Sequence, residues 1–292
     1  MSNEATIQKN SEILFIYDAK LSNPNGDMDN ENKPRMDYDT STNLVSDVRL
    51  KRYLRDYFET ALGEKIFISE TAKDAKDRAK QLKSDKLDYT DLIDVRLFGA
   101  VFAATGANTH LTGPVQFNWG YSLNPVEINE SSTITSSFSG GEGIGKDYRV
   151  KYSLIAFDGS VNAHVAKHTK LNNENLEAFD KAMLKAIPFN RTRSKTGQTP
   201  RLYLRIQTNK DCFLKDLREY IKLDYKTDEY KVRNIDDFQL DLSKLKNYLN
   251  QHKEEIEKIY YWVDEKLKII DCEDIAAYLK IDSMIELEAI ST

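Results

Sequence analysis

The order of strand-like and helix-like segments most strongly constrains how this chain folds. "ILFIYDAK" (13–20) is apolar and rich in branched and aromatic side chains, which is typical of a buried strand. Five more segments follow as helix, strand, strand, helix and strand, at 46–59, 113–128, 148–162, 174–187 and 201–208. The order predicts an α+β, ferredoxin-like fold, an antiparallel sheet with two helices on one face. We expect this domain over residues 1–208, with the second sheet face free for binding.

The first helical segment, 46–59, has one apolar and one basic face. Ser46 is a good N-cap, and the apolar stripe predicted to enter the core comprises Leu50, Tyr53, Leu54, Tyr57 and Phe58. Lys51, Arg52 and Arg55 lie at positions i, i+1 and i+4, so they share a second face. A face with three cations can hold phosphate.

Charge is divided unevenly along the 292 residues, whose net charge is −5. Residues 209–292 hold 14 Lys and Arg against 20 Asp and Glu, whereas the rest of the chain holds 28 against 27. We expect this acidic part to be mostly helical, with helices at 242–259 and 272–280 around a strand-like "KIYYWV", and to pack on the first domain. The two cysteines and the lack of a long apolar run predict a soluble protein of the cytoplasm.

The loop after the first strand, "NPNGDMDNENKPRMD" (23–37), places an oxygen-bearing side chain at every second position from Asn23 to Glu31. A calcium loop starting at Asp27 needs glycine at its sixth position and glutamate at its twelfth, but Asn32 and Tyr38 stand there. Asn, Asp, Gly and Pro are also common in turns. The pattern therefore favours a turn.

Two segments interrupt the domain. Residues 64–92 are highly charged and are predicted to be a solvated helical insertion. Residues 129–147 form an arm rich in Ser, Thr and Gly that carries three isolated apolar side chains, Ile134, Phe138 and Ile144. Apolar residues exposed on such an arm usually contact a partner.

Several catalytic patterns are incomplete. "GGEGIGK" (140–146) has the spacing of a P-loop, but Asp147 replaces the required Ser or Thr and a strand follows. "HVAKH" (164–168) lacks the glutamate of a zinc protease helix and an evident third ligand. Cys212 and Cys272 have no histidine motif nearby. We expect no catalytic residue, no metal and no cofactor.

The loop "NRTRSKTGQTPR" (190–201) favours nucleic-acid binding instead. It carries Arg191, Arg193, Lys195 and Arg201 without an acidic residue, among hydroxyl and amide groups that bond phosphate and sugar oxygens. Together with the basic helix face and the arm, it indicates RNA more than a solvated surface.

The sequence resembles a known family over roughly residues 12–208. The resemblance rests on the first strand and its loop, followed in order by "LVSDVRLKRYLRDYF", "DVRLFGAVF", "TGPVQFNWGYSLNPV" and "RTRSKTGQTPR". These motifs together are similar to those of the CRISPR-associated protein seven family of the RAMP superfamily, in its type I-B (Csh-type) branch. Members form the backbone of the antiviral Cascade complex.

This resemblance implies a hand-shaped protein with an RRM-like palm, a fingers insertion at 60–93 and a β-hairpin thumb at 124–149. It also implies a homo-oligomeric filament along a CRISPR RNA, which pairs with target DNA. The other expected partners are the large, small and handle-binding subunits of Cascade. Such a protein should grip the backbone of the guide and leave its pairing edges open.

We expect the guide to contact two groups of residues. The proposed RNA-binding set is Asn25, Lys51, Arg52, Arg55, Gln116, Lys146, Arg149, Arg191, Arg193, Lys195 and Arg201. The proposed thumb wedge is Ile134, Phe138 and Ile144.

Two enzymatic alternatives remain open. Asp27 or Asp29 would cut target RNA with a metal if the chain acted like the backbone subunits of type III complexes. His110 or His164 would serve as the base if it processed CRISPR RNA.

Overall fold

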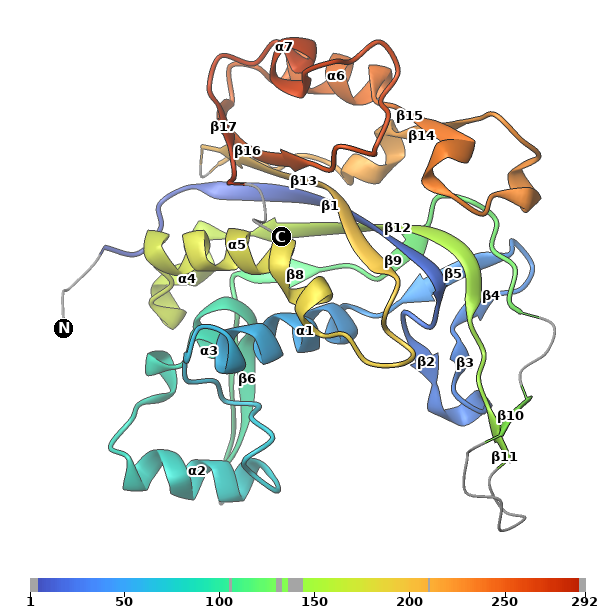
Figure 1. Cartoon of the computed structure of the whole chain (residues 1–292). Helices are drawn as coiled ribbons and strands as arrows, with labels where there is room; N and C mark the ends of the chain where they lie inside the picture. The colour runs from blue at the N-terminus through green and yellow to red at the C-terminus, as the bar shows by residue number, and fades with distance from the viewer. Residues whose placement is uncertain (1–4, 105–106, 130–132, 136–143, 210, 289–292) are drawn as a thin grey trace.

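Strand β1 (Asn10–Ser22) runs through the middle of the protein (Figure 1). The computed structural model describes residues 5–104, 107–129, 133–135, 144–209 and 211–288. Every residue of β1 from Asn10 to Ala19 is buried, so both faces of this strand are covered. Among the described residues, none of the helices has the length and apolar character that crossing a membrane requires.

The main sheet is built outward from β1. β1 pairs antiparallel with β12 (Val150–Val161) on one side and with β13 (Gln198–Thr208) on the other, so that Phe15 stands opposite both Phe157 and Tyr203. Nine strands of the described residues join this sheet, in the order β17-β16-β13-β1-β12-β9-β5-β4, with β8 also on β12. The added strands are β4 (Met36–Asp37), β5 (Thr42–Val45), β8 (Val115–Phe117), β9 (Gly120–Ser122), β16 (Ile256–Val263) and β17 (Met284–Glu286). Only the pairing of β16 with β17 is parallel among these strands.

Two long helices cover the first face of the sheet. α1 (Asp47–Thr60) and α5 (Asn173–Phe189) pack against each other and on the sheet, and the short α4 (Ala163–Thr169) precedes α5. The predicted apolar stripe of α1 is confirmed, because all five of its side chains are buried. This core also takes in Phe15, Tyr17 and Phe157 from the strands.

The second face of the sheet is not free, so that expectation is wrong. Leu14, Ile16 and Leu204 point from the strands into a second core, whose other side is formed by residues such as Phe238 and Leu245. Figure 1 shows the C-terminal part lying over this face. The strands are apolar on both sides, and a sheet of that kind needs cover on both faces.

The C-terminal part is mixed rather than mostly helical, a second correction. In its described residues, α6 (Ser243–Gln251) and α7 (Ile275–Leu279) are 9 and 5 residues long. The remaining elements are β14 (Lys222–Tyr225), β15 (Phe238–Asp241), β16, β17 and the 3₁₀ turns η3 (Leu217–Tyr220), η4 (Glu229–Lys231) and η5 (Ile235–Asp237). The predicted strand "KIYYWV" is confirmed within β16. β16 is rich in branched and aromatic residues, which favour strands, and it pairs antiparallel with β13.

The charged insertion belongs to a small lobe with its own core. This lobe contains α2 (Ala75–Ser84), η2 (Tyr89–Asp91), α3 (Ile93–Phe98) and the hairpin β6 (Gly99–Ala104) and β7 (Ala107–Thr112). The core consists of Phe67, Leu82, Leu92, Val95 and Phe102. The predicted helix in the insertion is confirmed. The lobe is not only a solvated surface segment, because apolar residues that are far apart in its sequence pack together in a core.

The single long strand expected at 113–128 is divided into β8 and β9. The side chain of Asn118 accepts a hydrogen bond from the backbone N–H of Trp119 at 2.8 Å, which turns the chain between them. Gly120 then lies against Phe157, where a Cβ atom would approach the ring to 2.4 Å. The arm continues as the hairpin β10 (Thr133–Thr135) and β11 (Ile144–Lys146). The opening loop contains β2 (Gly26–Asp27), η1 (Met28–Asn30) and β3 (Lys33–Pro34).

Candidate nucleic-acid interface

Three segments singled out from the sequence meet at one pocket. They are the opening loop, the base of the hairpin arm and the basic loop after α5. The pocket has a volume of about 250 Å³ and is lined by Asn23, Asn32, Lys146, Asp147, Tyr148, Thr192, Arg193 and Ser194. Residues more than 150 positions apart in sequence therefore form one polar surface.

The basic loop is fixed to the end of β1 by backbone contacts. The N–H of Asn23 donates to the carbonyl of Ser194 at 2.8 Å, and that of Lys20 donates to the carbonyl of Gly197 at 2.8 Å. Gly197 has φ +97°, and a Cβ atom there would lie 2.4 Å from the Lys20 oxygen. Only glycine allows this close approach, which holds the neighbouring cations against the opening loop.

Arg149 holds the base of the arm in place. Its guanidinium donates to the carbonyl oxygens of Leu21 at 2.8 Å and Arg193 at 3.2 Å, and pairs with the Asp147 carboxylate at 2.9 Å. Asp147 and Arg193 line the pocket, and Leu21 lies near the end of β1, just before the opening loop. In this arrangement Arg149 positions the interface, and its donors are already occupied.

Two exposed cations, Lys146 and Arg193, line the pocket, and Arg191 lies two positions before Arg193 in the basic loop. Lys146 pairs with Glu31 at 2.5 Å, and this hydrogen bond, with a second one from Tyr148, lowers the pKa of Glu31. Arg193 is 64% exposed and only 3.3 Å from Asp147. Arg191 is exposed, and its side chain has no hydrogen bond or ion pair to the residues that the structure describes. Both arginines are therefore accessible to a ligand.

Lys195 lies deeper than the rim, and the charge of Arg49, a cation that the sequence analysis missed, acts on it. Its ammonium donates to the carbonyl oxygens of Asn23 and of Pro24, the latter at 3.3 Å. Burial, together with the charge of Arg49, lowers the pKa of Lys195 to about 7. The Arg49 guanidinium stacks on the ring of Tyr53 at 3.9 Å. Arg49 was missed because it lies outside the helix face that Lys51, Arg52 and Arg55 were predicted to share. The sequence feature that could have identified it is a cation one helical turn before an aromatic residue, Tyr53.

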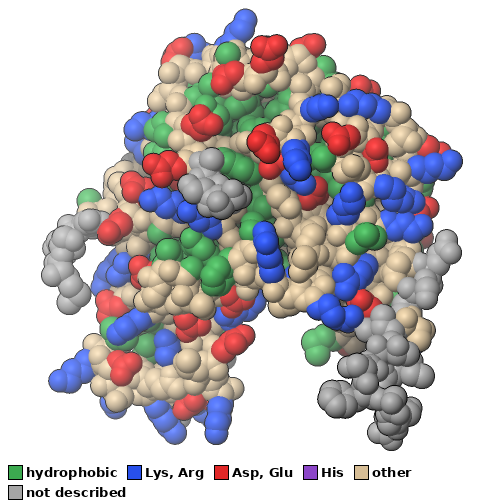
Figure 2. All heavy atoms as spheres, in the orientation of Figure 1, with side chains coloured by type: hydrophobic (Ala, Val, Ile, Leu, Met, Phe, Trp, Pro, Cys, Tyr) green, Lys and Arg blue, Asp and Glu red, His purple; other side chains and the backbone are tan. Residues whose placement is uncertain are grey.

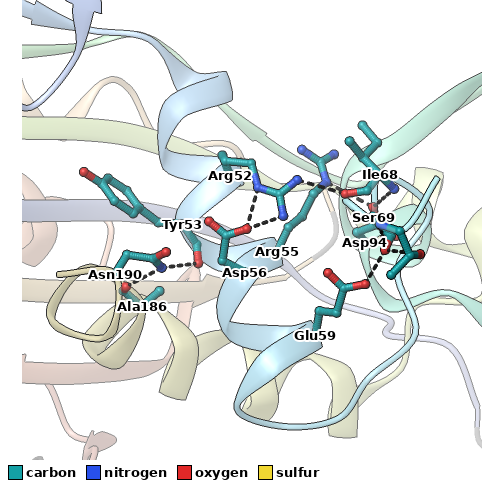
Figure 3. A network of polar contacts seen from close by, with 11 residues as sticks. Arg52, Tyr53, Arg55, Asp56, Glu59, Ile68, Ser69, Asp94, Ala186 and Asn190 are labelled. Carbon is teal, nitrogen blue, oxygen red and sulfur yellow. Dashed lines mark hydrogen bonds and ion pairs between the residues drawn. The ribbon is translucent and has the colours of Figure 1, made fainter. Parts of the chain in front are cut away.

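Two cations of α1, Lys51 and Arg52, each pair with a carboxylate of the same helix, and Figure 3 shows the pair of Arg52. Lys51 lies 2.9 Å from Asp47 and 3.4 Å from the amide oxygen of Gln116, which is itself exposed. Arg52 pairs with Asp56 and donates to the Ile68 carbonyl at 2.9 Å. The structure thus brings Lys51 and Gln116 together at one place.

Contrary to expectation, the three cations do not share an exposed face, because Lys51 is buried and so is Arg55. The Arg55 side chain lies 3.0 Å from the buried carboxylate of Asp94 (Figure 3). Burial lowers the pKa of Arg55, and Asp94 opposes that effect. The helix turns this position toward the α2 lobe, which the spacing of cations alone does not reveal.

Asn25 and Arg201 also make structural contacts. The side-chain oxygen of Asn25 accepts hydrogen bonds from the backbone N–H of Ser46 at 2.8 Å and from its hydroxyl at 2.9 Å. Ser46 is the N-cap of α1 as predicted, but its own hydroxyl does not cap the helix. Arg201 pairs with Asp18 at 2.8 Å and Asp264 at 2.5 Å. Both residues join segments of the fold and are largely buried.

The molecular surface is hollowed beside these elements. Figure 2 shows a concavity between the lobe that contains α2 and the side of the molecule from which the arm projects. Lys and Arg side chains lie along both sides of it. A concave surface bordered by cations suits an extended polyanion.

Comparison with known proteins identifies the family of this chain. The family model of the CRISPR-associated protein Cas7 matches residues 9–243. The chain belongs to the Cas7 family. The CRISPR-associated protein Cas7 of Haloferax volcanii is 31% identical over 306 residues, which cover 90% of this chain and 89% of that protein.

Solved structures agree with the Cas7 assignment at the level of the fold. A chain of a CRISPR RNA-guided surveillance complex matches with a TM-score of 0.59 and 18% identity, covering 96% of this chain and 95% of its own length. A chain of such a complex in a pre-nicking state matches with a TM-score of 0.56 and 14% identity, and 96% of each chain is covered.

The residues of the two enzymatic alternatives are dispersed in this Cas7-family chain. Asp27 lies 3.1 Å from Arg35, and Asp29 is exposed in η1. His110 is exposed on β7, and His164 lies on α4. Among the described residues, no three His, Cys, Asp or Glu side chains are grouped as metal ligands.

The structure describes the backbone of only two of the three residues of the proposed thumb wedge. Phe138 lies outside the described residues. Ile134 and Ile144 belong to the paired strands β10 and β11, opposite Gly145 and Thr135.

Proposed function

We propose that this Cas7-family chain binds a CRISPR RNA through the concave surface around the pocket and polymerises along it. The observation that carries the proposal is the convergence of the opening loop, the arm base and the basic loop on one surface. Arg191 and Arg193 offer exposed guanidinium groups there. Guanidinium groups bind phosphate whatever the base sequence, as a protein that carries any guide requires.

The arrangement of the sheet supports a ferredoxin-like palm at residues 1–208. Its inner strands follow the order β13-β1-β12 with β8 and β9 beside β12, and α1 and α5 cover one face. We assign the lobe around 60–93 to the fingers and the arm at 124–149 to the thumb. Residues 209–292 pack on the palm and stabilise it.

In this proposal the protein is the backbone subunit of a type I-B Cascade of the cytoplasm. The surveillance complexes matched by fold are RNA-guided, as their names state. By analogy, the chain holds the guide for pairing with target DNA and contacts further copies of itself and the large, small and handle-binding subunits. Its own role is binding, without catalysis.

Co-expression with a CRISPR RNA tests this function directly. Native mass spectrometry of the purified product should show one RNA with several copies of the chain, because each copy covers only a short stretch of guide. The matched control is the same expression without a CRISPR RNA, which should yield subunits not arrayed on a guide. A chain that stays monomeric and free of RNA in both cases contradicts the proposal.

A further inference from the structure

Strand β17 is the last strand at one side of the main sheet, and only β16 pairs with it among the described strands. Figure 1 shows β17 between α5 on one side and α6 and α7 on the other. The N–H of Leu287, just after β17, donates to the carbonyl of Tyr261 at 2.8 Å. Because neighbouring residues of a strand turn their backbone groups to opposite edges, those of Met284 and Glu286 point away from β16. This edge can therefore take a further strand.

A largely apolar pocket lies beside this edge, between β17 and α5. Its volume is about 440 Å³, and its apolar lining comes from Leu184 of α5, Tyr260 of β16, Ile285 and Leu287. Its charged lining residues are of both signs, and one of them, Asp180, is already paired with Arg205 at 2.6 Å. A pocket of this size accommodates a bulky apolar side chain.

A second pocket lies at the same edge, on the opposite face of the sheet. Its volume is about 230 Å³, and buried Leu267, Ile269 and Ile275 form its floor. The charged residues that line it are all acidic, namely Asp264, Glu265, Glu273, Asp274 and Glu286. Glu286 lines both pockets, so the two pockets flank β17.

The carboxylates of this acidic pocket are only partly engaged. Asp264 pairs with Arg201 at 2.5 Å, and Asp274 accepts the N–H of Ala277 at 2.7 Å in the first turn of α7. The other three are exposed and make no ion pair with the described residues, namely Glu265, Glu273 and Glu286. Free carboxylates above an apolar floor fit a Lys or Arg side chain, because its methylene stem packs on apolar groups while its charged head reaches the acids.

We infer that the β17 edge binds an extended segment of a partner protein in which basic and apolar side chains alternate. Successive side chains of an added strand point to opposite faces of the sheet. One set therefore enters the apolar pocket beside α5, and the other set enters the acidic pocket, while the backbone pairs with β17.

The charge of the edge decides between kinds of occupant. Carboxylates repel a phosphate backbone, so a nucleic acid does not fit this surface. A second copy of the chain bound edge to edge would place Glu286 near its own equivalent, and like charges on neighbouring strands are destabilising. The two pockets share no lining residue with the pocket of the candidate interface, so the inference goes beyond RNA binding.

Binding of a synthetic peptide to the RNA-free, full-length chain tests the inference. The probe is a short fluorescent peptide in which Lys alternates with Leu, and fluorescence anisotropy gives its affinity. A peptide with Glu in place of every Lys keeps the alternation and should not bind. The Lys–Leu peptide N-methylated at every residue keeps the side chains but loses its backbone donors, so it should bind about tenfold more weakly or worse.

Variants of the protein locate the two pockets. Glu273→Gln with Glu286→Gln removes two free carboxylates and should weaken binding about five- to tenfold. Ile285→Ser, at a position that is 38% exposed, should weaken binding through the apolar pocket. The matched control is Glu229→Gln with Glu254→Gln, which makes the same change in charge at two exposed positions outside both pockets and should bind as the wild type does.

Hydrogen exchange followed by NMR locates the backbone contact. The N–H groups of Met284 and Glu286 should exchange more slowly when the Lys–Leu peptide is bound, because they then donate to its carbonyl oxygens. Unchanged exchange at both positions overturns the pairing with β17.

Other results also overturn the inference. They are no binding of the Lys–Leu peptide below about 1 mM, equal binding of its Glu or N-methylated form, and equal binding by the two double variants. Binding that requires the removal of residues 289–292, or a dimer of the chain that the peptide dissociates, would make the chain itself the occupant. The co-expression test of RNA binding is independent of these results, so the two proposals can fail separately.

Discussion

Nε of Arg55 lies 3.0 Å from a carboxylate oxygen of Asp94, and both side chains are buried between α1 and the α2 lobe. The same carboxylate accepts hydrogen bonds from the backbone N–H groups of Phe67 at 2.6 Å and Ile68 at 3.2 Å. One acidic residue therefore fixes the lobe to the helix. Because the lobe and the helix border the concave surface, this pair sets its shape.

Asp94→Asn should destabilise the protein by about 3–5 kcal/mol, since it leaves the Arg55 guanidinium buried without a counter-charge. Urea unfolding monitored by circular dichroism measures this difference. The matched control is Asp282→Asn, which breaks the exposed pair with Lys253 at 2.9 Å and should leave the free energy of unfolding nearly unchanged. Equal effects of the two changes would show that burial does not strengthen the Arg55 pair.

Arg191→Gln and Arg193→Gln together should weaken RNA binding regardless of base sequence. If each arginine neutralises one phosphate, each loss reduces the slope of log affinity against log salt by about 0.7. Fluorescence anisotropy at several salt concentrations gives this slope. Lys244→Gln, on the exposed surface of α6, is the control and should retain the wild-type slope. An unchanged slope in the double variant would remove the basic loop from the interface.

Glu12→Gln should stabilise the protein near neutral pH. Burial, and then the neighbouring Asp158 carboxylate, raise the pKa of Glu12 to about 8. In the folded protein Glu12 therefore prefers to be protonated, so its contribution to stability is full below its unfolded pKa and is lost as pH rises through the folded value. The expected gain at about pH 7.5 is on the order of 2 kcal/mol.

Urea unfolding between about pH 5 and 8 checks this effect, because stability should fall less steeply with pH in Glu12→Gln than in the wild type. Glu254→Gln removes an exposed carboxylate and should reproduce the wild-type profile. A profile for Glu12→Gln that matches the wild type would mean that Glu12 is ionised in the folded protein.

Replacing residues 131–144 by a short Gly-Ser turn should leave the monomer folded and abolish ordered assembly on the guide. The two cores are built from residues of the sheet, the helices α1 and α5 and the C-terminal part, so we expect the change to cost little stability. If the arm contacts bases or a neighbouring copy, each contact contributes about 1–3 kcal/mol and is repeated along the filament. Circular dichroism checks the fold, and native mass spectrometry counts the copies. Full-length particles from the shortened chain would contradict the thumb assignment.

Much of the fold was predictable because its signals are local. The helix at 46–59 and the strand at 13–20 were identified from the spacing of apolar residues, and both are present as α1 and β1. Periodicity reports which side of an element is buried. It does not report what covers a strand that is apolar on both sides. For that reason the sequence predicted that residues 209–292 pack on the first domain but not that they cover the second sheet face.

The candidate site also has some features that the sequence predicts and others that only the tertiary structure determines. The sequence by itself determined the basic composition of the loop with Arg191 and Arg193, because no acid interrupts it, and it determined the resemblance to the Cas7 family. Only the tertiary structure decided which cations are available, since a charge is neutralised by neighbours in space. Arg55 meets Asp94 from 39 positions away, whereas the Lys195 ammonium donates to the backbone carbonyl oxygens of Asn23 and Pro24. Both outcomes depend on where the folded chain excludes water, which sequence spacing does not specify.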